Sequence, residues 1–327
     1  MQQINWGIIG CGDVTEVKSG PAFNKVGQSK LVAVMRRDAA KVKDYAMRHG
    51  VPKYYTDAQG LIDDPDINAI YIATPPDSHE AYSLAAIAAG KPVYVEKPMT
   101  LNTASAIKIT KAANESNVKL VVAHYRRQQP LYLQLKEIID SNILGDIRLV
   151  KLSMIKKRLT TGQLSINKTS WRVNTAIAGG GLFHDLAPHQ LDILYYLLGN
   201  AKSVQGIATN QAGIYAADDM VTGSILFEKN ILFQGNWCFS VANINEEDTC
   251  EIIGENGKLS FSFFKTAPIT LNVNGMQQVY EFHALQHVQQ PMIEKVVQYF
   301  LDMADNPCSG EEGIVIMQWL DAITKPH

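Results

Sequence analysis

Short apolar runs alternate with longer helical stretches over the first 123 residues of the chain. The apolar runs, each of which predicts a strand, are residues 4–9, 30–36, 68–73, 91–96 and 118–123. Between them, residues 39–49, 79–89 and 102–116 have the length and composition of helices. Strands that alternate with helices in this way predict right-handed crossovers and a parallel sheet covered on both faces. We therefore expect a doubly wound α/β domain here.

The rhythm changes after Pro130. A helix over 131–140, a long strand-like segment over 145–158 and a helix near 186–198 come first, and two helices near 291–303 and 311–323 close the chain. Between them, alternating apolar and polar positions are interrupted by the turns "EKN", "GENG" and "NG", which predict hairpins and an antiparallel sheet. The domains predicted are 1–123 and 124–327, and the last helices are free to pack back on the first domain.

Composition excludes several classes of partner. The 327 residues carry a net charge of −2, so no broad basic face is expected to attract nucleic acid or a membrane surface. No apolar run approaches the ~18 residues of a membrane span, and the first residues do not resemble a secretory signal. The four cysteines lie far apart, without the spacing of a zinc site or a disulfide framework. We expect a cytoplasmic globular protein.

A glycine-rich turn follows the first predicted strand and precedes a helix. The turn and the start of the helix comprise Gly10, Cys11, Gly12, Asp13 and Val14. The first glycine allows a tight turn, the second lets a pyrophosphate approach the backbone, and the amides at the helix start hold its charge. Thr15 stands where a third small residue is usual, so the fingerprint is incomplete. Its position after the first strand favours a dinucleotide site over a plain turn.

The end of the second predicted strand bears on which dinucleotide binds. Proteins that bind NAD usually carry Asp or Glu about 20 residues past the glycines, to hold the ribose 2′-hydroxyl. Here the strand ends in "AVMRRD", with Arg36 and Arg37 at that place. A guanidinium can bind a 2′-phosphate bidentately, whereas a carboxylate repels it. We predict NADP as the preferred cofactor; the alternative is NAD, with Asp38 in the acidic role and both arginines solvated.

The strand 91–96 runs directly into an adjacent carboxylate and ammonium. In a doubly wound sheet, ligands bind beyond the carboxyl ends of the strands, so Glu96 and Lys97 are expected at the cofactor crevice. Pro98 fixes the local turn and is able to adopt a cis bond. A lysine at this place can exchange a proton with a substrate hydroxyl. Taken alone, Lys97 is better explained as an exposed lysine at a strand end.

The segment "AGGGLFHDLAPHQLDIL" gives Lys97 a candidate partner. Asp185, His189 and Asp192 are spaced i, i+4 and i+7, which places them on one stripe of a helix. Pro188 prefers the first helical turn, so we expect the helix to begin near Leu186, with Asp185 at its cap. A carboxylate beside an imidazole, after three glycines that permit close approach, fits proton transfer. A structural histidine and a metal site are the alternatives, and no further ligand cluster supports the metal.

These segments together resemble the glucose–fructose oxidoreductase / inositol dehydrogenase / MocA family (Gfo/Idh/MocA). The resemblance spans nearly the whole chain and rests on "GIIGCGDV", "ATPPDSH", "AGKPVYVEKP", "HYRRQQP" and "WRVNTAIAGGGLFHDLAPH". The EKP and GGGxxxDxxxH signatures are its specific part. It implies an N-terminal Rossmann domain and a C-terminal α/β domain whose large, mostly antiparallel open sheet often mediates homodimers or homotetramers.

The resemblance also implies roles for individual residues. Lys97, followed by a cis bond to Pro98, is the shared catalytic residue and a contact to the substrate hydroxyl. His189 is the acid/base, and Asp185 is its partner and a substrate contact. The residues implied to line the cofactor cleft are Ala73, Thr74, Pro75, His79 and Glu96, with His124 near the nicotinamide. Positions that commonly face cofactor or substrate are Tyr125, Arg126, Trp171 and Arg172.

The sequence departs from the family pattern in three places. Thr15 and Arg36 are two of them, and the third is Gly20-Pro21 in the middle of the first helix. Proline in a helix interior breaks or kinks it. Such a break would leave Lys18 and Ser19 able to turn toward the phosphates or the substrate.

Residues and resemblance together predict an NAD(P)-dependent oxidoreductase that moves a hydride between the nicotinamide and a carbinol or carbonyl carbon. The substrate class that the family implies is a sugar, inositol or related polyol. One rival is a dinucleotide-binding regulator, a class that usually lacks the catalytic lysine or histidine. The other is a glycoside hydrolase that uses NAD in a transient redox cycle.

Overall fold

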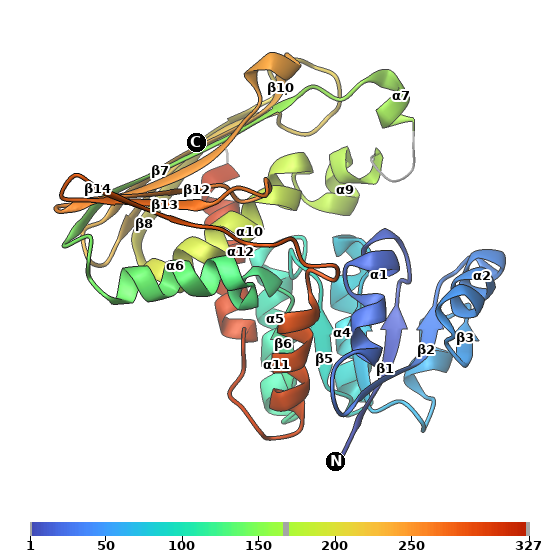
Figure 1. Cartoon of the computed structure of the whole chain (residues 1–327). Helices are drawn as coiled ribbons and strands as arrows, with labels where there is room; N and C mark the ends of the chain where they lie inside the picture. Colours follow the sequence, from blue (N-terminus) through green and yellow to red (C-terminus); the bar gives the residue numbers. More distant parts are fainter. Residues whose placement is uncertain (1, 166–169, 325–327) are drawn as a thin grey trace. The chain divides into compact units, whose positions relative to one another are not determined.

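The computed structural model describes residues 2–165 and 170–324, and these divide into two compact units (Figure 1). Unit 1 comprises Met1–Gln129 and Leu285–Met317, and unit 2 comprises Pro130–Ala284 and Gln318–His327. Each unit contains one of the two sheets of the chain. The chain therefore leaves unit 1 after the last strand of its sheet and returns to it for a helical segment near the end.

Unit 1 is built on a six-stranded parallel sheet of order β3-β2-β1-β4-β5-β6. Its strands are β1 (Ile4–Ile9), β2 (Ser29–Met35), β3 (Lys53–Tyr55), β4 (Ala69–Ile72), β5 (Val93–Val95) and β6 (Leu120–Val122). Residues on both faces of the central strands are buried, which is why these segments are almost continuously apolar. The predicted parallel, doubly wound Rossmann sheet is confirmed. Only the short edge strand β3 was not predicted.

Helices connect these strands and cover the sheet. They are α1 (Asp13–Val17), η1 (Gly20–Asn24), α2 (Ala39–His49), α3 (Ala58–Ile62), η2 (Pro76–Ser78), α4 (His79–Ala88), α5 (Thr103–Glu115), η3 (Tyr125–Gln128) and α11 (Gln290–Phe300). The bounds of α2 coincide with those predicted, because a capping aspartate precedes it and a glycine follows it. The expected break at Gly20-Pro21 is confirmed, since α1 ends three residues earlier and a 3₁₀ turn begins there.

Unit 2 is built on an eight-stranded sheet of order β14-β13-β12-β11-β7-β10-β9-β8. Its strands are β7 (Ile147–Lys157), β8 (Ala201–Thr209), β9 (Met220–Phe227), β10 (Leu232–Val241), β11 (Glu247–Gly254), β12 (Gly257–Phe261), β13 (Ile269–Val273) and β14 (Met276–Tyr280). The three hairpins predicted from turn residues are β9–β10, β11–β12 and β13–β14. All neighbours are antiparallel except β10 and β7, so the mostly antiparallel sheet is confirmed.

The two faces of this sheet differ in exposure. Buried residues alternate with exposed or half-buried ones along β7, β9, β10 and β11. Figure 1 shows α6 (Pro130–Asp140) and α10 (Gly181–Leu198) along one face. Trp237 of β10 packs edge-on against Phe183 of α10, with ring centroids 5.0 Å apart. Along the chain, β7 is followed by α7 (Thr161–Leu164), η4 (Trp171–Val173) and α9 (Thr175–Ala178) before α10 begins, and η5 (Asn243–Asn245) precedes β11.

The helix α10 begins earlier than the sequence predicted. It starts at Gly181 and contains Pro188 in its interior, whereas a start near Leu186 was expected, so that expectation was wrong. The residues of the added turns include Phe183, which is fully buried against the sheet. Packing of this apolar side chain therefore outweighs the local preference of proline for the first helical turn. The chain closes with α12 (Gly310–Thr324), and none of the helices described combines the length and apolar character needed to cross a membrane.

Candidate functional site

The carboxyl ends of five strands of unit 1 bring several predicted residues to one edge of the sheet. A ladder of backbone hydrogen bonds continues past the strand ends. Gly10 N donates to Met35 O at 2.9 Å, and Ala73 N donates to Ile9 O at 2.8 Å. Further along, Glu96 N donates to Ile72 O at 2.9 Å and Ala123 N donates to Val95 O at 2.8 Å. The glycine loop and the segments at 73–75, 96–98 and 123–126 therefore lie along the same edge.

The two glycines of the loop have different roles. Gly10 has φ +94°, and a Cβ there would lie 2.5 Å from Thr74 Cγ2 and 2.8 Å from Thr74 N. Gly10 is therefore required by the close approach of the segment after β4. A Cβ on Gly12 would instead meet nothing nearer than Gly10 O, at 3.8 Å. The backbone at Gly12 is thus open to a group approaching from outside the protein.

The start of α1 follows directly from this loop. Gly12 is the N-cap residue, and Asp13 and Val14 form the first positions of the helix. Thr15, which replaces the usual small residue, exchanges hydrogen bonds of 3.0 and 2.9 Å with Gly12 N and O. The residues therefore fit a dinucleotide pyrophosphate, which needs an unobstructed glycine and helix-start amides. Burial raises the pKa of the Cys11 thiol to about 12, so this side chain is an inert part of the loop.

The arginines after β2 lie beside the loop. Arg36 Nη1 donates to Cys11 O at 3.3 Å, which brings the guanidinium over the glycine turn, while Arg37 is exposed. Asp38 is the N-cap of α2, where Oδ1 accepts from Lys41 N at 3.1 Å and Oδ2 pairs with Lys41 Nζ at 3.2 Å. The hydrogen bond from the Lys41 amide is the main cause that lowers the pKa of Asp38. The Asp38 carboxylate is therefore engaged in capping a helix.

His79 connects two of the strand-end segments. Its side chain is fully buried, with Nδ1 3.0 Å from Pro98 O and Nε2 2.8 Å from Thr74 O. Burial lowers the pKa of the imidazole, and the two carbonyls act against that shift. Pro75 precedes the 3₁₀ turn η2. His79 therefore contacts the predicted cofactor-binding segments at their backbone carbonyls, those of Thr74 and Pro98.

Glu96 and Lys97 follow β5 at the same edge. The Lys97-Pro98 bond is cis, as the resemblance implied. Glu96 is 6% exposed, and its Oε2 accepts from Lys97 N at 3.2 Å. Its Oε1 accepts from Tyr71 Oη and from Gln289 Nε2, both at 2.6 Å. Sequence reasoning missed Tyr71 and Gln289, because neither belongs to a motif and the glutamine lies 193 residues away along the chain.

The segment after β6 carries the remaining predicted residues of unit 1. His124 and Tyr125 are buried, and Arg126 is half-buried with its guanidinium carbon 5.7 Å from the centre of the Tyr125 ring. Ser19, at the end of the first helix, lies in the interior of unit 1. It is fully buried, with its Oγ 3.2 Å from Tyr71 Oη, while Lys18 O accepts from Gln289 N at 3.1 Å.

In unit 2, Arg172 and Asp185 form an ion pair. Arg172 Nε donates to Asp185 Oδ2 at 3.1 Å, and both side chains are partly exposed. The guanidinium also lies over the Trp171 ring, 4.5 Å from its centre, a favourable cation–π arrangement. Three of the predicted substrate contacts are thereby brought together by η4 and the N-terminal part of α10.

His189 lies one turn further along α10 and is 5% exposed. Its ring meets Phe264 edge-on, with centroids 5.8 Å apart. Asp192, three residues later, is 1% exposed. Among the described residues, no three His, Cys, Asp or Glu side chains form a cluster that could hold a metal ion.

The two glycines at the start of α10, Gly180 and Gly181, serve packing inside unit 2. A Cβ on Gly180 would lie 2.0 Å from His184 Nδ1, and one on Gly181, at φ +76°, would lie 2.5 Å from Ala217 Cβ. Burial lowers the pKa of His184 to about 4, so this ring is neutral. The close approach that these glycines permit is therefore made to His184 and Ala217.

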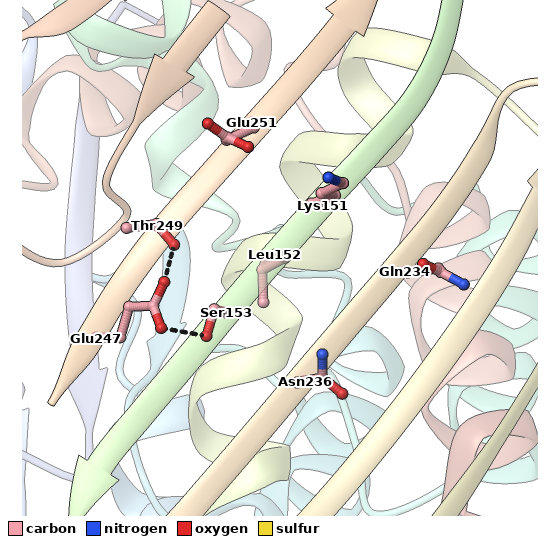
Figure 2. A pocket seen from close by; sticks show the side chains of 8 residues that line it. All are labelled: Lys151, Leu152, Ser153, Gln234, Asn236, Glu247, Thr249 and Glu251. Atoms are coloured by element: carbon pink, nitrogen blue, oxygen red, sulfur yellow. Dashed lines mark hydrogen bonds between the residues drawn. The ribbon is translucent and has the colours of Figure 1, made fainter. Parts of the chain in front are cut away.

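A separate polar hollow of about 430 Å³ lies on the outward face of the unit 2 sheet (Figure 2). It is lined by Lys151, Leu152, Ser153, Gln234, Asn236, Glu247, Thr249 and Glu251. In Figure 2, Glu247 accepts hydrogen bonds from Ser153 and Thr249, at 2.9 and 2.7 Å. None of the residues predicted to carry the chemistry lines the hollow, and its polar side chains alternate along the strands with buried residues.

Comparison with known proteins gives matches over both units. Residues 4–124 match a family described as "Oxidoreductase family, NAD-binding Rossmann fold", and residues 132–260 match the "GFO/IDH/MocA C-terminal domain". Oxidoreductase P35 of Formosa agariphila is 46% identical over 319 residues, which cover 98% of each chain. The 1,5-anhydro-D-fructose reductase of Ensifer adhaerens is 27% identical over 256 residues, 78% of this chain and 74% of that protein.

A solved structure shares the fold. Levoglucosan dehydrogenase in complex with NADH matches with a TM-score of 0.89 at 20% identity, covering 98% of this chain and 96% of that one. The resemblance drawn from the sequence motifs is confirmed by the two family matches and by the relative of 46% identity. This chain belongs to the Gfo/Idh/MocA oxidoreductase family, whose first domain is an NAD-binding Rossmann fold.

Proposed function

We propose that this oxidoreductase interconverts a carbinol and a carbonyl group on a sugar, inositol or related polyol. The observation that carries the proposal is the edge of the unit 1 sheet, where the glycine loop and Lys97 follow strands of the same sheet. A nicotinamide cofactor, when bound, supplies or accepts the hydride. Support for the substrate class comes from a relative named for 1,5-anhydro-D-fructose.

The protein's own residues handle the proton in this proposal. In the oxidative direction His189 accepts the proton of the substrate hydroxyl, and Lys97 donates to the developing alkoxide or shares in the relay. Asp185 steadies His189 and contacts the substrate. Its carboxylate is held by Arg172, 3.1 Å away, which restricts its orientation one helical turn before His189. Tyr125, Arg126 and Trp171 are proposed to contact the substrate.

A panel of sugars, inositols and sugar acids, assayed with NAD and with NADP, tests this function. The expected result is a change in the absorbance of the reduced nicotinamide that is stoichiometric with product. Release of free sugar from a glycoside without net change in that absorbance would favour the glycoside hydrolase. Dinucleotide binding without turnover of any member of the panel would favour the regulator.

We propose further that NADP is preferred over NAD. Arg36 lies over the glycine loop, where its guanidinium can meet a 2′-phosphate, whereas Asp38 is engaged at the N-cap of α2. Replacing Arg36 by Asp is expected to weaken NADP binding about tenfold or more, since hydrogen bonds to charged groups are worth ~1.5–3 kcal/mol. Asp38→Ala is the matched control and should leave the NADP/NAD ratio unchanged, with a small loss of stability from the removed cap. If Asp38→Ala changes the NADP/NAD ratio and Arg36→Asp does not, the proposed preference is overturned.

We also propose a homodimer or homotetramer that assembles through the outward face of the unit 2 sheet. That face carries exposed or half-buried side chains on every second residue of its strands, and a second copy packed on it would bury them. Asn236→Arg, which places a charge in the polar hollow of Figure 2, is expected to yield a smaller species in light scattering. An unchanged mass would count against this face. A cytoplasmic location is proposed as well, because all four cysteines are free thiols.

A further inference from the structure

The Glu96 carboxylate is held by donors from two distant segments of unit 1 and by the amide of the residue that follows it. Tyr71 Oη and Gln289 Nε2 both donate to Oε1 at 2.6 Å, and Lys97 N donates to Oε2 at 3.2 Å. Tyr71 and Gln289 are fully buried, and Glu96 is 6% exposed. A buried carboxylate is stable only when its oxygens accept such bonds. The side chain of Glu96 is therefore fixed at one oxygen and orients the Lys97 amide with the other.

Gln289 also joins this carboxylate to the end of the glycine-loop helix. Its backbone amide donates to Lys18 O at 3.1 Å, directly after α1. Two residues earlier, His287 Nδ1 lies 2.6 Å from Val17 O. The segment 285–290 thus bonds through its backbone and His287 to the helix that follows the glycines, and through the Gln289 side chain to the carboxylate beside Lys97.

The chemistry of the two buried donors suits a fixed scaffold. A glutamine amide does not titrate, so Gln289 donates at every pH at which the protein is folded. Burial raises the pKa of Tyr71 well above its usual value, and the phenol therefore stays a donor too. Hydrogen bonds to a carboxylate are roughly twice as strong as bonds between neutral groups. Loss of either donor would leave the carboxylate free to turn, and the Lys97 amide with it.

We propose that Gln289 is a positioning residue for Lys97, acting with Tyr71 through the Glu96 carboxylate. The inference rests on the proposed role of Lys97 in proton handling. It adds that the segment returning to unit 1 near the end of the chain sets the geometry of the EKP turn. A purely structural Gln289 would affect the stability of unit 1 and leave the surroundings of the Lys97 amine unchanged in the folded protein.

The test compares three variants of the full chain. Gln289→Met keeps the length of the side chain and removes the donor, and Tyr71→Phe removes the other donor while keeping the buried ring. Gln286→Met is the matched control, because Gln286 is an exposed residue of the same segment that contacts only Lys25 among the described hydrogen bonds, at 3.3 Å. Thermal unfolding and NADH binding by fluorescence establish that each variant is folded.

The deciding measurement is competitive labelling of lysines with acetic anhydride, read by mass spectrometry. Lys111, whose side chain is 70% exposed, serves as the internal reference. We expect the labelling rate of Lys97 relative to Lys111 to change at least ~3-fold in Gln289→Met and Tyr71→Phe, the change that half a pKa unit gives for any amine. In Gln286→Met the ratio should match the wild type. Wild-type ratios in folded Gln289→Met or Tyr71→Phe would overturn the inference.

Turnover separates this inference from the proposed function. With the fastest sugar or polyol of the panel, kcat of Gln289→Met should fall about 10- to 100-fold with little change in NADH affinity, as expected for a misplaced reacting group. If Lys97→Ala keeps its turnover, the role of Lys97 fails, whatever the labelling shows. If Lys97→Ala is inactive and Gln289→Met turns over like the wild type, the positioning role alone fails.

Discussion

The glycine loop offers one substitution with opposite expectations at two positions. Gly10→Ala places a methyl group 2.5 Å from Thr74 Cγ2 and 3.0 Å from the carbonyl carbon of Ala73, at a residue with φ +94°. Left-handed backbone costs an alanine ~1–2 kcal/mol, and overpacking costs ~1–3 kcal/mol more. We therefore expect a loss of ~2–5 kcal/mol in the free energy of unfolding. At ~2–4 °C per kcal/mol, the midpoint should fall by about 4–20 °C.

Gly12→Ala should leave stability nearly unchanged and weaken dinucleotide binding. Its backbone is extended, at φ −148°, and the added methyl group would lie 3.8 Å from Gly10 O, an ordinary contact. The free energy of unfolding should change by less than ~1 kcal/mol, the difference between glycine and alanine at an N-cap. The methyl group would however stand where a pyrophosphate meets the backbone, so dinucleotide affinity should fall about tenfold or more.

Two measurements on Gly10→Ala and Gly12→Ala test these expectations for stability and for dinucleotide affinity. Thermal unfolding followed by circular dichroism reports stability, and titration with NADPH or NADH followed by fluorescence reports affinity. The expected pattern is a destabilised Gly10→Ala and a stable Gly12→Ala that binds weakly. A Gly12→Ala variant with wild-type affinity would refute the assignment of this loop to the pyrophosphate. A Gly10→Ala variant with wild-type stability would refute the steric argument at the turn.

Three further predictions concern charge, thiols and catalysis. Hydrogen bonds from Arg48, at 2.8 and 2.9 Å, lower the pKa of Glu16 to about 2, so this pair stabilises the fold above the usual value of 4.5 and is lost as pH falls toward 2. Glu16→Gln should therefore melt lower than the wild type at neutral pH, by ~1 kcal/mol for a partly exposed pair, with the gap closing below about pH 4. N-ethylmaleimide should modify the half-buried Cys238 before Cys11, whose pKa burial raises to about 12; equal rates by mass spectrometry would contradict this. Lys97→Ala should lower turnover about 10²–10⁴-fold and keep cofactor affinity, and near-normal turnover would remove Lys97 from the mechanism.

Much of the fold follows from local pattern. The strands of unit 1 are short apolar runs because they are buried on both faces, and α2 is bounded by its own capping residues. The hairpins of unit 2 follow from turn sequences that are two to four residues long. Each of these features depends on residues close together in the chain, which is why periodicity and turn chemistry are sufficient to find them.

The start of α10 and the parallel pairing of β10 with β7 depend instead on contacts between residues that are far apart in the chain. Phe183 extends the helix N-terminally because Trp237, 54 residues later, offers it a buried surface. The strands β7 and β10 pair although β8 and β9 lie between them in the sequence. Neither partner is indicated by the residues next to it, since burial energy depends on surfaces that exist only once the sheet has formed.

The candidate site likewise has some features that follow from local sequence and others that depend on the folded structure. The sequence by itself located the glycine turn, the EKP turn and the Asp185–His189 stripe, because each is a short motif of residues close together in the chain. Tertiary structure alone decided that Gly181 makes room for Ala217 and that Gln289 reaches Glu96. These roles depend on hydrogen bonds and steric contacts that the neighbouring residues do not specify, above all where the partners lie far apart in the chain and meet only when it has folded.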